Sequence, residues 1–267
     1  MQTRAVSRKF VQTVQAMLTS QRKKAILDAL ERDGQVLAND LSAAFGVSED
    51  TVRRDLRELA AEGRLQRVHG GALPASPAVA PLAAREDMDV AAKQRVARKA
   101  ASMIEPGQVV IVDGGTTSAL LAQCLAPDLV ATIVTHSPSI AVALASHPHV
   151  EVVLIGGRLY KHSVVSVGAA AVEAMSHIHA DLYFMGVTGV HATAGLSTGD
   201  YEEAYVKRAL AARAAETVVL ACASKLNAAS PFRIGGLELA QTLVVEASAS
   251  AKLTRPLEEA GLTVVKA

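Results

Sequence analysis

The chain has 267 residues, of which half are hydrophobic and only 3% aromatic, and its formal net charge is +1. This length accommodates one large domain or two unequal ones, whereas a near-zero net charge does not by itself indicate a nucleic-acid partner. Two cysteines are too few for a disulfide framework, and no apolar run reaches the roughly 18 residues of a membrane span. Since no secretory signal is recognisable either, we expect a cytoplasmic protein without a membrane anchor.

Residues 1–19 are interpreted as an N-terminal extension. The first 24 residues contain no acid, and their basic residues are Arg4, Arg8, Lys9, Arg22, Lys23 and Lys24. This basic run could contact DNA or could be a solvated terminus. Apolar side chains from Phe10 to Leu18 recur at helical spacing, which favours a short extra helix. Alternatively, Met17 is the native start, and the sequence leaves both interpretations open.

Residues 20–73 are expected to form a winged helix-turn-helix. The apolar spacing predicts a first helix over Gln21–Asp33, ended by Gly34, and a second helix over Ala38–Phe45. A two-residue turn follows. Ser48 is then a good N-cap for a third helix, because its hydroxyl can accept a hydrogen bond from a backbone N–H of the first turn.

The third predicted helix has one apolar seam, made by Val52, Leu56 and Leu59. Its other faces are polar or charged, with Asp50, Thr51, Arg53, Arg54, Arg57 and Glu58. In a helix-turn-helix the second of the paired helices places such side chains in the major groove. Arginine suits this task, because its planar guanidinium can bind guanine or phosphate through two hydrogen bonds. The alternative is an ordinary charged surface in which Arg54 and Glu58 form an i,i+4 pair.

A short basic hairpin, or wing, is predicted over Arg64–Gly71. It carries Arg67, His69 and Gly70. Phosphate contacts from such a wing would fix the position of the head on DNA without reading its sequence. Residues 74–84 are interpreted as a linker, because three prolines in the eight residues 74–81 disfavour a helix or a central strand.

Residues 85–267 are expected to form an α/β domain, because short apolar runs alternate with helical patterns. The predicted strands are Val109–Val112, Ala131–Thr135, Val150–Ile155, Leu182–Val187, Thr217–Leu220, Thr242–Val245 and Leu262–Val265, and the predicted helices are Thr117–Leu125, Ser139–Ser146, Ala169–Ser176, Tyr201–Ala214 and Leu257–Ala260. Near-continuous apolar strands are typical of a parallel sheet buried on both faces. The pattern therefore indicates a Rossmann-like open parallel sheet.

A candidate anion site follows the first strand of this domain. The strand leads into Asp113, Gly114, Gly115, Thr116 and Thr117, which begin a helix. Backbone N–H groups and the helix dipole at such a turn favour a bound anion. The aspartate, at the carboxyl end of a strand, could accept a hydrogen bond from a sugar hydroxyl. The alternative is an ordinary turn with a helix cap.

Other predicted strands end in small, polar or cationic residues: His136, Gly156, Gly157, Gly186 and Lys225. Ligands of open α/β sheets bind at this edge. Lys225 is the favoured side-chain partner for a phosphate, although it could be a solvated surface lysine. The spacing of His147 with His149, and of His177 with His179, lacks further metal ligands. We therefore expect no metal and no other cofactor.

Both parts of the chain resemble the DeoR family of bacterial regulators. In the head the matching residues are Val47-Ser48, Thr51-Val52-Arg53-Arg54-Asp55-Leu56 and Arg67-Val68-His69-Gly70-Gly71-Ala72; in the larger part they include Asp113-Gly114-Gly115-Thr116-Thr117, Leu154-Ile155-Gly156-Gly157, Gly195-Leu196-Ser197-Thr198, Glu202-Glu203, Val206-Lys207-Arg208-Ala209 and Ser224-Lys225. The resemblance covers about residues 17–265. It implies a sensor domain with the fold of ribose-5-phosphate isomerase, which usually binds a phosphorylated sugar or sugar alcohol.

The resemblance also implies roles for individual residues. Ser48, Thr51, Arg53 and Arg54 would contact DNA from the recognition helix, joined by Arg57 on the exposed side, and Arg67, His69 and Gly70 would contact it from the wing. Asp113, Gly115, Thr116, Thr117 and Lys225 would line the pocket. Two departures concern the ligand: His136 stands where the family usually has Asn, and Cys222-Ala223 replaces Asp-Ser before Ser224-Lys225.

The favoured function is a transcriptional regulator, as a repressor of carbohydrate genes that leaves operator DNA when its effector binds. A homodimer or homotetramer is expected, because palindromic half-sites match a symmetric protein. One alternative is a sugar-phosphate isomerase or deaminase with a DNA-binding head, for which Asp113 has no evident acid–base partner. Another is a DNA-binding protein whose α/β domain only oligomerises.

Overall fold

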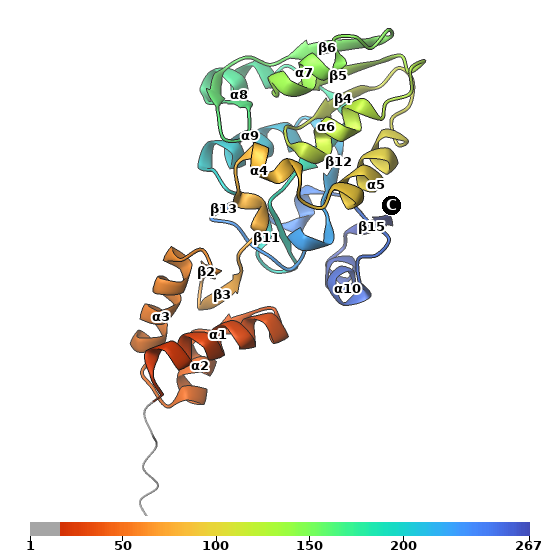
Figure 1. The fold of residues 1–267 in the computed structure, drawn as a ribbon. Coiled ribbons are helices and arrows are strands. Elements are labelled where there is room, and N and C mark those ends of the chain that lie inside the picture. The colour runs from red at the N-terminus through yellow and green to blue at the C-terminus, as the bar shows by residue number, and fades with distance from the viewer. Residues whose placement is uncertain (1–16) are drawn as a thin grey trace, which may run out of the picture.

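The structure, a computed structural model, describes residues 17–267. The predictions for residues 1–16 lie outside the described residues. Figure 1 shows a small helical head joined to a larger α/β domain. No helix in the described range is long and apolar enough to cross a membrane.

The head confirms the predicted helix-turn-helix and wing. Its elements are α1 (Thr19–Asp33), β1 (Val36–Leu37), α2 (Ala38–Phe45), α3 (Glu49–Ala61), β2 (Leu65–Val68) and β3 (Gly71–Pro74). Gly34 ends α1 in the left-handed conformation, and Ser48 caps α3 by accepting from the Thr51 backbone N–H. The three strands form one sheet in the order β1-β3-β2. The apolar seam of α3 packs on Ile26 and Leu30 of α1.

A buried ion pair, absent from the sequence-based predictions, joins α1 to α3. The Arg22 guanidinium donates to both carboxylate oxygens of Asp55, from Nη2 at 3.0 Å and from Nε more closely. Both side chains are almost fully buried. The aspartate of the Arg-Arg-Asp-Leu motif therefore holds α3 against α1 and lies on the buried side of α3.

The expectation that three prolines disfavour a helix or a central strand in residues 74–81 is wrong. Pro74 ends β3, which is the central strand of the head sheet, and Pro77 begins the 3₁₀ helix η1 (Pro77–Val79). Proline is tolerated at these two places because the first turn of a helix needs no N–H, and a strand end can pair through the carbonyl alone. The Pro74 carbonyl indeed accepts from the Ala229 backbone N–H at 3.2 Å.

The larger domain is built on a seven-stranded sheet in the order β15-β14-β12-β9-β4-β5-β6, in which all neighbours are parallel. In chain order the strands are β4 (Val109–Val112), β5 (Ala131–Thr135), β6 (Val150–Leu154), β9 (Ala180–Gly186), β12 (Ala214–Leu220), β14 (Thr242–Val245) and β15 (Thr263–Lys266). This confirms the open parallel sheet. All seven predicted strands are present: β4, β5 and β14 have the predicted bounds, and the ends of the other four differ by up to three residues.

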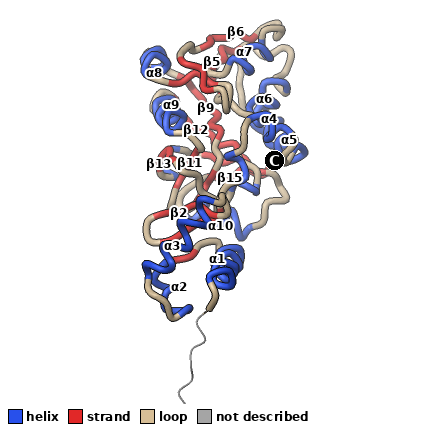
Figure 2. The backbone as a smooth tube through the Cα atoms, turned by 60° about the vertical axis from the view of Figure 1, so that its left-hand side comes forward, coloured by secondary structure: helices blue, strands red, loops and turns tan. Residues whose placement is uncertain are grey.

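Helices cover both faces of the sheet (Figure 2). One side carries α5 (Val90–Ala101), α6 (Thr116–Gln123) and α7 (Pro138–Leu144), and the other carries α8 (Ala169–Met175), α9 (Tyr201–Ala211) and α10 (Ala251–Glu259). Successive strand residues alternate between the two cores: Val110 and Val112 face one, and Ile111 faces the other. A strand must be apolar at every position to serve both cores, which explains the near-continuous apolar runs.

Several elements were not predicted, because they are short or lie among polar residues. They are α4 (Leu82–Glu86), α5, the hairpin β7 (Arg158–Tyr160) and β8 (Val165–Val167), the antiparallel sheet β10 (Gly189–His191), β11 (Gly195–Thr198) and β13 (Phe232–Gly235), and the 3₁₀ helices η2 (Ala223–Lys225) and η3 (Leu237–Leu239). The prediction that strand Val150–Ile155 is buried on both faces is also wrong. Its strand β6 is an edge strand, with Val153 and Leu154 37% and 49% exposed.

Candidate functional site

The exposed face of α3 carries the arginines predicted to meet DNA. Arg53, Arg54 and Arg57 are exposed, and Arg53 pairs with Glu49 one turn earlier at 2.7 Å. Glu58 pairs with Lys23 of α1 at 3.0 Å, so the alternative pairing of Arg54 with Glu58 is wrong. The helix thus presents basic side chains on the side away from its apolar seam.

The wing depends on two adjacent glycines. Gly70, with φ 78°, occupies the left-handed region at the turn between β2 and β3. A Cβ on Gly71 would lie 1.9 Å from the Val36 carbonyl oxygen, so only glycine lets β1 pair with β3. Arg67 and His69 are exposed on this hairpin and also line a cleft between the wing and the sensor domain. The structure therefore places both residues at the interdomain cleft, and their predicted contact with DNA stays a prediction.

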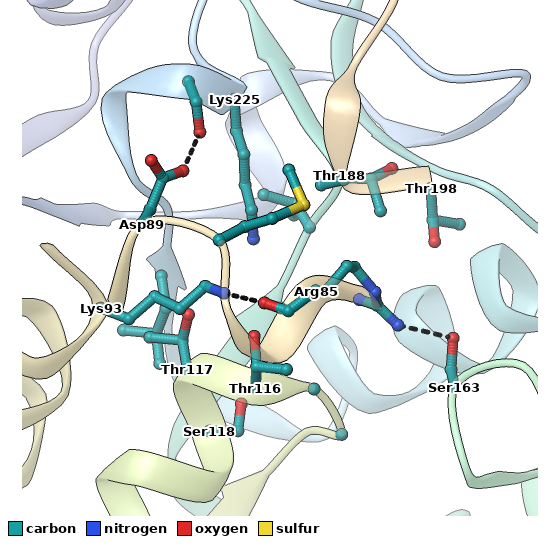
Figure 3. A pocket seen from close by; sticks show the side chains of 18 of the residues that line it. Arg85, Asp89, Lys93, Thr116, Thr117, Ser118, Ser163, Thr188, Thr198 and Lys225 are labelled. Atoms are coloured by element: carbon teal, nitrogen blue, oxygen red, sulfur yellow. Dashed lines mark hydrogen bonds between the residues drawn. The ribbon is translucent and has the colours of Figure 1, made fainter. Parts of the chain in front are cut away.

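A pocket lies at the carboxyl ends of the central strands, beside the N-terminus of α6 (Figure 3). Including the space open to solvent at its mouth, it encloses about 640 Å³. Its lining residues are Ala78, Arg85, Met88, Asp89, Lys93, Gly114, Gly115, Thr116, Thr117, Ser118, Ser163, Gly186, Val187, Thr188, Thr198, Glu203, Lys207, Leu220, Ser224 and Lys225. Six of the ten residues predicted for ligand binding are among them.

Four of the lining side chains are cationic, against two carboxylates, Asp89 and Glu203. The cations are Arg85, Lys93, Lys207 and Lys225. Desolvation lowers the pKa of Lys225 to about 8, with the three other cations acting in the same direction. Burial likewise lowers the pKa values of Lys93 and Arg85. A cluster of like charges under partial burial costs free energy, which a bound anion would reduce.

The N-terminus of α6 adds backbone donors to these cations. Gly115, with φ 120°, precedes the helix, so that Thr116, Thr117 and Ser118 form its first turn. N–H groups of a first turn have no partner within the helix. Within the described chain, the Thr117 hydroxyl and the Arg85 Nε are buried polar atoms without a hydrogen-bond partner. Unpaired buried donors at a pocket wall are expected where a ligand supplies the acceptor.

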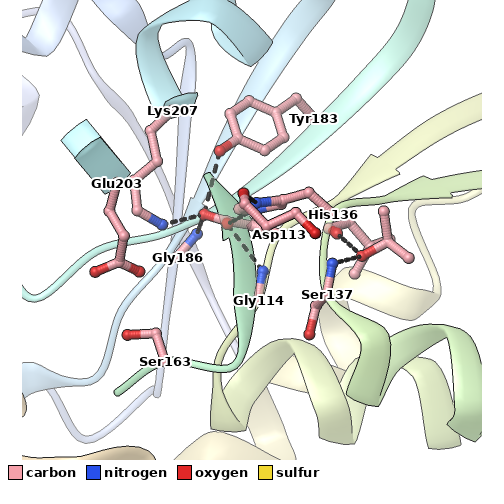
Figure 4. A network of polar contacts seen from close by, with 12 residues as sticks. Asp113, Gly114, His136, Ser137, Ser163, Tyr183, Gly186, Glu203 and Lys207 are labelled. Carbon is pink, nitrogen blue, oxygen red and sulfur yellow. Dashed lines mark hydrogen bonds and ion pairs between the residues drawn. The ribbon is translucent and has the colours of Figure 1, made fainter. Parts of the chain in front are cut away.

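Asp113 does not line the pocket, contrary to the prediction that it contacts a sugar hydroxyl. Its carboxylate is fully buried and is held by five donors (Figure 4): Lys207 Nζ at 2.5 Å, His136 Nε2 at 2.8 Å, Tyr183 Oη at 3.1 Å, and the backbone N–H groups of Gly114 and Gly186 at 2.8 and 2.9 Å. Desolvation raises the pKa of Asp113, but Lys207 and His136 together outweigh it and hold that pKa well below its usual range. Asp113 therefore holds three pocket-lining residues, Gly114, Gly186 and Lys207, in place from beneath the pocket.

His136 is likewise a buried support outside the pocket lining. Its Nε2 contacts Asp113, and its Nδ1 lies 2.9 Å from the Ser166 carbonyl oxygen. Both ring nitrogens are therefore occupied by contacts within the protein. The structure thus places this departure from the family pattern under the pocket. Gly156 and Gly157 also lie outside the lining, where Gly157 approaches Ala171 and Val167 of the β8–α8 region.

The second departure from the family pattern leaves no carboxylate at residue 222. The Cys222 side chain is buried, and desolvation raises the pKa of its thiol to about 11, so it stays neutral. Glu246 at the end of β14 supplies a carboxylate nearby, accepting from the Ala223 backbone N–H at 3.0 and 3.1 Å. No group of three or more possible metal ligands occurs within residues 17–267.

Sequence reasoning missed the side chains that complete the pocket: Arg85, Lys93, Thr188, Thr198, Glu203 and Lys207. Glu203 and Lys207 are one turn apart on α9 and both buried, a signal visible as two charged residues on the apolar side of a helical pattern. Arg85 lies next to the segment interpreted as a linker, and Lys93 lies in a helix that was not predicted.

Comparisons with known proteins agree with these observations. The family model for the DeoR-like helix-turn-helix domain matches residues 22–77, and the model for the DeoR C-terminal sensor domain matches residues 88–247. The HTH-type transcriptional regulator GlpR of Haloferax volcanii is 32% identical over 93% of the chain and 98% of its own length. The glycerol-3-phosphate regulon repressor of Escherichia coli K12 is 29% identical over 86% and 92%.

Solved structures are more distant. Ribose 5-phosphate isomerase A of Methanocaldococcus jannaschii gives a TM-score of 0.37 with 20% identity, covering 50% of the chain and 52% of its own. This value is too low to support any statement about ligand or activity.

Proposed function

Because the chain belongs to the DeoR family of DNA-binding transcriptional regulators, we propose that its pocket binds the phosphate group of a sugar or sugar alcohol and thereby controls the affinity of the head for operator DNA. The observation that carries this proposal is the meeting of Arg85, Lys93 and Lys225 with the N-terminus of α6. Helix N-termini and paired cations both favour a phosphate dianion. Glu203 and Thr198 offer polar groups for the hydroxyls beside it.

The chain is a regulator and not an enzyme. Its relatives are likewise named transcriptional regulators or repressors. The aspartate that could have served as a catalytic base is buried and held by five donors, so it cannot accept a proton from a substrate in the pocket. We assign it to the support of Lys207 and of the turn at Gly114. The third alternative, an α/β domain that only oligomerises, does not account for the cationic pocket.

The finer parts of the proposal follow from chemistry. Operator DNA is read by α3 in the major groove, and the wing contacts the flanking backbone. Two copies bind together as a homodimer or within a homotetramer, because symmetric half-sites require symmetric heads. The protein acts as a cytoplasmic repressor: bound effector favours a conformation or assembly in which the two heads no longer match their half-sites. An effector that leaves operator affinity unchanged at saturation would refute this mechanism.

A thermal-shift screen tests the ligand class. Glycerol 3-phosphate, ribose 5-phosphate and glucosamine 6-phosphate are each compared with the unphosphorylated parent. A ligand at ~100 times its dissociation constant adds about 2.7 kcal/mol, which raises the melting midpoint by several degrees, on the order of 2–4 °C per kcal/mol. We expect a shift with a phosphate ester and none with its parent.

Two variants make this screen specific for the pocket. Lys225→Met removes a pocket cation and should abolish most of the shift, whereas Lys99→Met, which removes an exposed lysine of α5, should retain it. An ester that shifts all three proteins equally would show that it binds elsewhere, and the absence of any shift would overturn the proposed ligand class.

A further inference from the structure

Residues 74–89, here called the strap, connect the wing to the sensor domain and also form part of the pocket wall. The strap leads from the end of β3 through η1 and α4 to the start of α5, and Figure 1 shows it passing from the head to the side of the larger domain near α6. Four of its residues line the pocket: Ala78, Arg85, Met88 and Asp89. A ligand in the pocket would therefore contact the same segment that begins at the end of the wing.

The end of the strap nearest the wing is attached to the sensor domain by hydrogen bonds. The Ala229 backbone N–H donates to the Pro74 carbonyl at 3.2 Å, and the Ser76 backbone N–H donates to the Ala229 carbonyl at 3.3 Å. The Ser76 hydroxyl donates to the Thr188 carbonyl, and this contact is buried. Since Pro74 is the last residue of β3, a displacement of this attachment would move the central strand of the head sheet.

The other end of the strap is attached around the pocket mouth. The Leu82 backbone N–H donates to the His162 carbonyl at 3.0 Å, Arg85 Nη2 donates to the Ser163 hydroxyl at 3.3 Å, and the Ser224 hydroxyl donates to Asp89 at 2.5 Å. Figure 3 shows Arg85 of α4 and Lys225 of η2 reaching the pocket from different elements. Arg85 Nε is buried without a partner in the described chain, so this guanidinium retains a donor for a ligand.

Thr188 joins the pocket to the attachment of the strap. It lines the pocket, its carbonyl accepts from Ser76, and its hydroxyl donates to Ser230 at 2.7 Å. Ser230 and Ser197, which contact each other at 3.0 Å, also line the cleft between the sensor domain and the wing. A continuous chain of hydrogen bonds therefore runs from the pocket wall to the interdomain surface.

We propose that the strap transmits occupancy of the pocket to the wing, with Arg85 as its contact to the anionic group of the ligand and the Ser76–Thr188 hydrogen bond as its attachment to the sensor domain. The inference rests on the proposed function. An anion held between Arg85 and the N-terminus of α6 draws α4 towards the pocket. The strap then shifts against Thr188 and Ala229, and β3 shifts with it. Ligand and DNA affinity are coupled because the position of the strap differs between the two states.

The test measures a coupling ratio, defined as the dissociation constant for DNA at saturating ester divided by that without ester. The ligand probe is the ester, among the three above, that gives the largest thermal shift. The DNA probe is a duplex that the wild-type protein selects from a random library. Ser76→Ala substitutes no pocket-lining residue and removes the attachment to Thr188, together with the hydrogen bond that the Ser76 hydroxyl accepts from the Ala78 backbone N–H at 3.1 Å. Ser176→Ala is the matched control, since it removes one serine-to-carbonyl hydrogen bond at the end of α8.

For wild type and Ser176→Ala we expect a coupling ratio within the usual range of about 5–150. For Ser76→Ala we expect a ratio near 1, with the affinity for the ester within about twofold of wild type, which also shows that the sensor is folded. A second variant, with two glycines inserted between Ala80 and Pro81, lengthens the strap and should lose coupling in the same way. In Arg85→Gln the affinity for the ester should fall at least about tenfold.

The outcomes separate this inference from the proposed function. If the ester binds and both strap variants retain the wild-type ratio, the strap does not transmit the signal, while the ligand assignment stands. If no ester binds the wild-type protein, both the proposed function and this inference are overturned.

Discussion

At the scale of single residues, Lys225 links ligand binding to protonation. Burial lowers its pKa to about 8 in the unliganded protein, so it is largely neutral at higher pH. A phosphate dianion beside it favours the charged form and raises that pKa again. Above about pH 8, binding therefore requires the uptake of a proton, whereas below that pH the proton is already present.

The affinity for a phosphate ester should consequently fall as pH rises above about 8, by up to about tenfold per pH unit. Titration calorimetry between about pH 7 and pH 10 measures this slope, since the ester itself stays a dianion over that range. Lys225→Met should bind more weakly at neutral pH and show a flatter profile. Equal slopes in both proteins would assign the titration to another group.

The unliganded stability responds to the same group in the opposite direction. Because the folded-state pKa of Lys225 lies below its ordinary value of about 10.4, the unfolded chain binds more protons between these two values. The contribution of Lys225 to stability therefore rises with pH across that window. Loss of ester affinity at alkaline pH cannot then be attributed to unfolding caused by this lysine.

Which residues line the pocket was only partly predictable from sequence. The turn Gly114–Thr117 and Lys225 follow strands whose positions were predicted, and the pocket lies there. Asp113 and His136 follow strands equally closely, but they pair with each other beneath the pocket, where Asp113 also accepts from Lys207. Sequence spacing gives the edge of the sheet at which a side chain lies, whereas the choice between pocket and support depends on contacts with distant segments.

At the scale of elements, the buried pair of Arg22 with Asp55 holds the recognition helix on α1. The helices α1, α3 and α9 and the apolar strands were predicted, because their periodicity is carried by local sequence, although the 12-residue α5 was missed. The antiparallel sheet of β10, β11 and β13 was not, since its strands are three to four residues long and come from two separate parts of the chain. The ion pair was likewise not predicted, because its partners lie 33 residues apart in the sequence.

Asp55→Asn should destabilise the head by about 3–5 kcal/mol, because it leaves the Arg22 guanidinium buried without its counter-charge. The matched control is Asp50→Asn, at a carboxylate of α3 whose side chain is 93% exposed. Hydrogen exchange of head amides in the full chain measures the change without requiring separate unfolding of the two domains. Equal protection in the two variants would show that the pair contributes little to the head.

At the scale of the whole molecule, the pocket and the predicted DNA-binding surface lie in different domains, which are joined by a segment that belongs to both. The wing ends in the strap, the strap lines the pocket, and the cleft beside the wing is lined by residues of β11 and β13. In the proposed mechanism, a small displacement of the pocket wall moves the strap and, with it, β3, the central strand of the head sheet.

The structure of the full chain crystallised with the effective phosphate ester tests the central claim most directly. We predict phosphate oxygens within about 2.7–3.2 Å of first-turn backbone N–H groups of α6 and of Arg85 or Lys225. The sugar or polyol should then extend towards Glu203 and Thr198. An ester bound in the cleft between the wing and the sensor domain, and not in the pocket, would contradict the account.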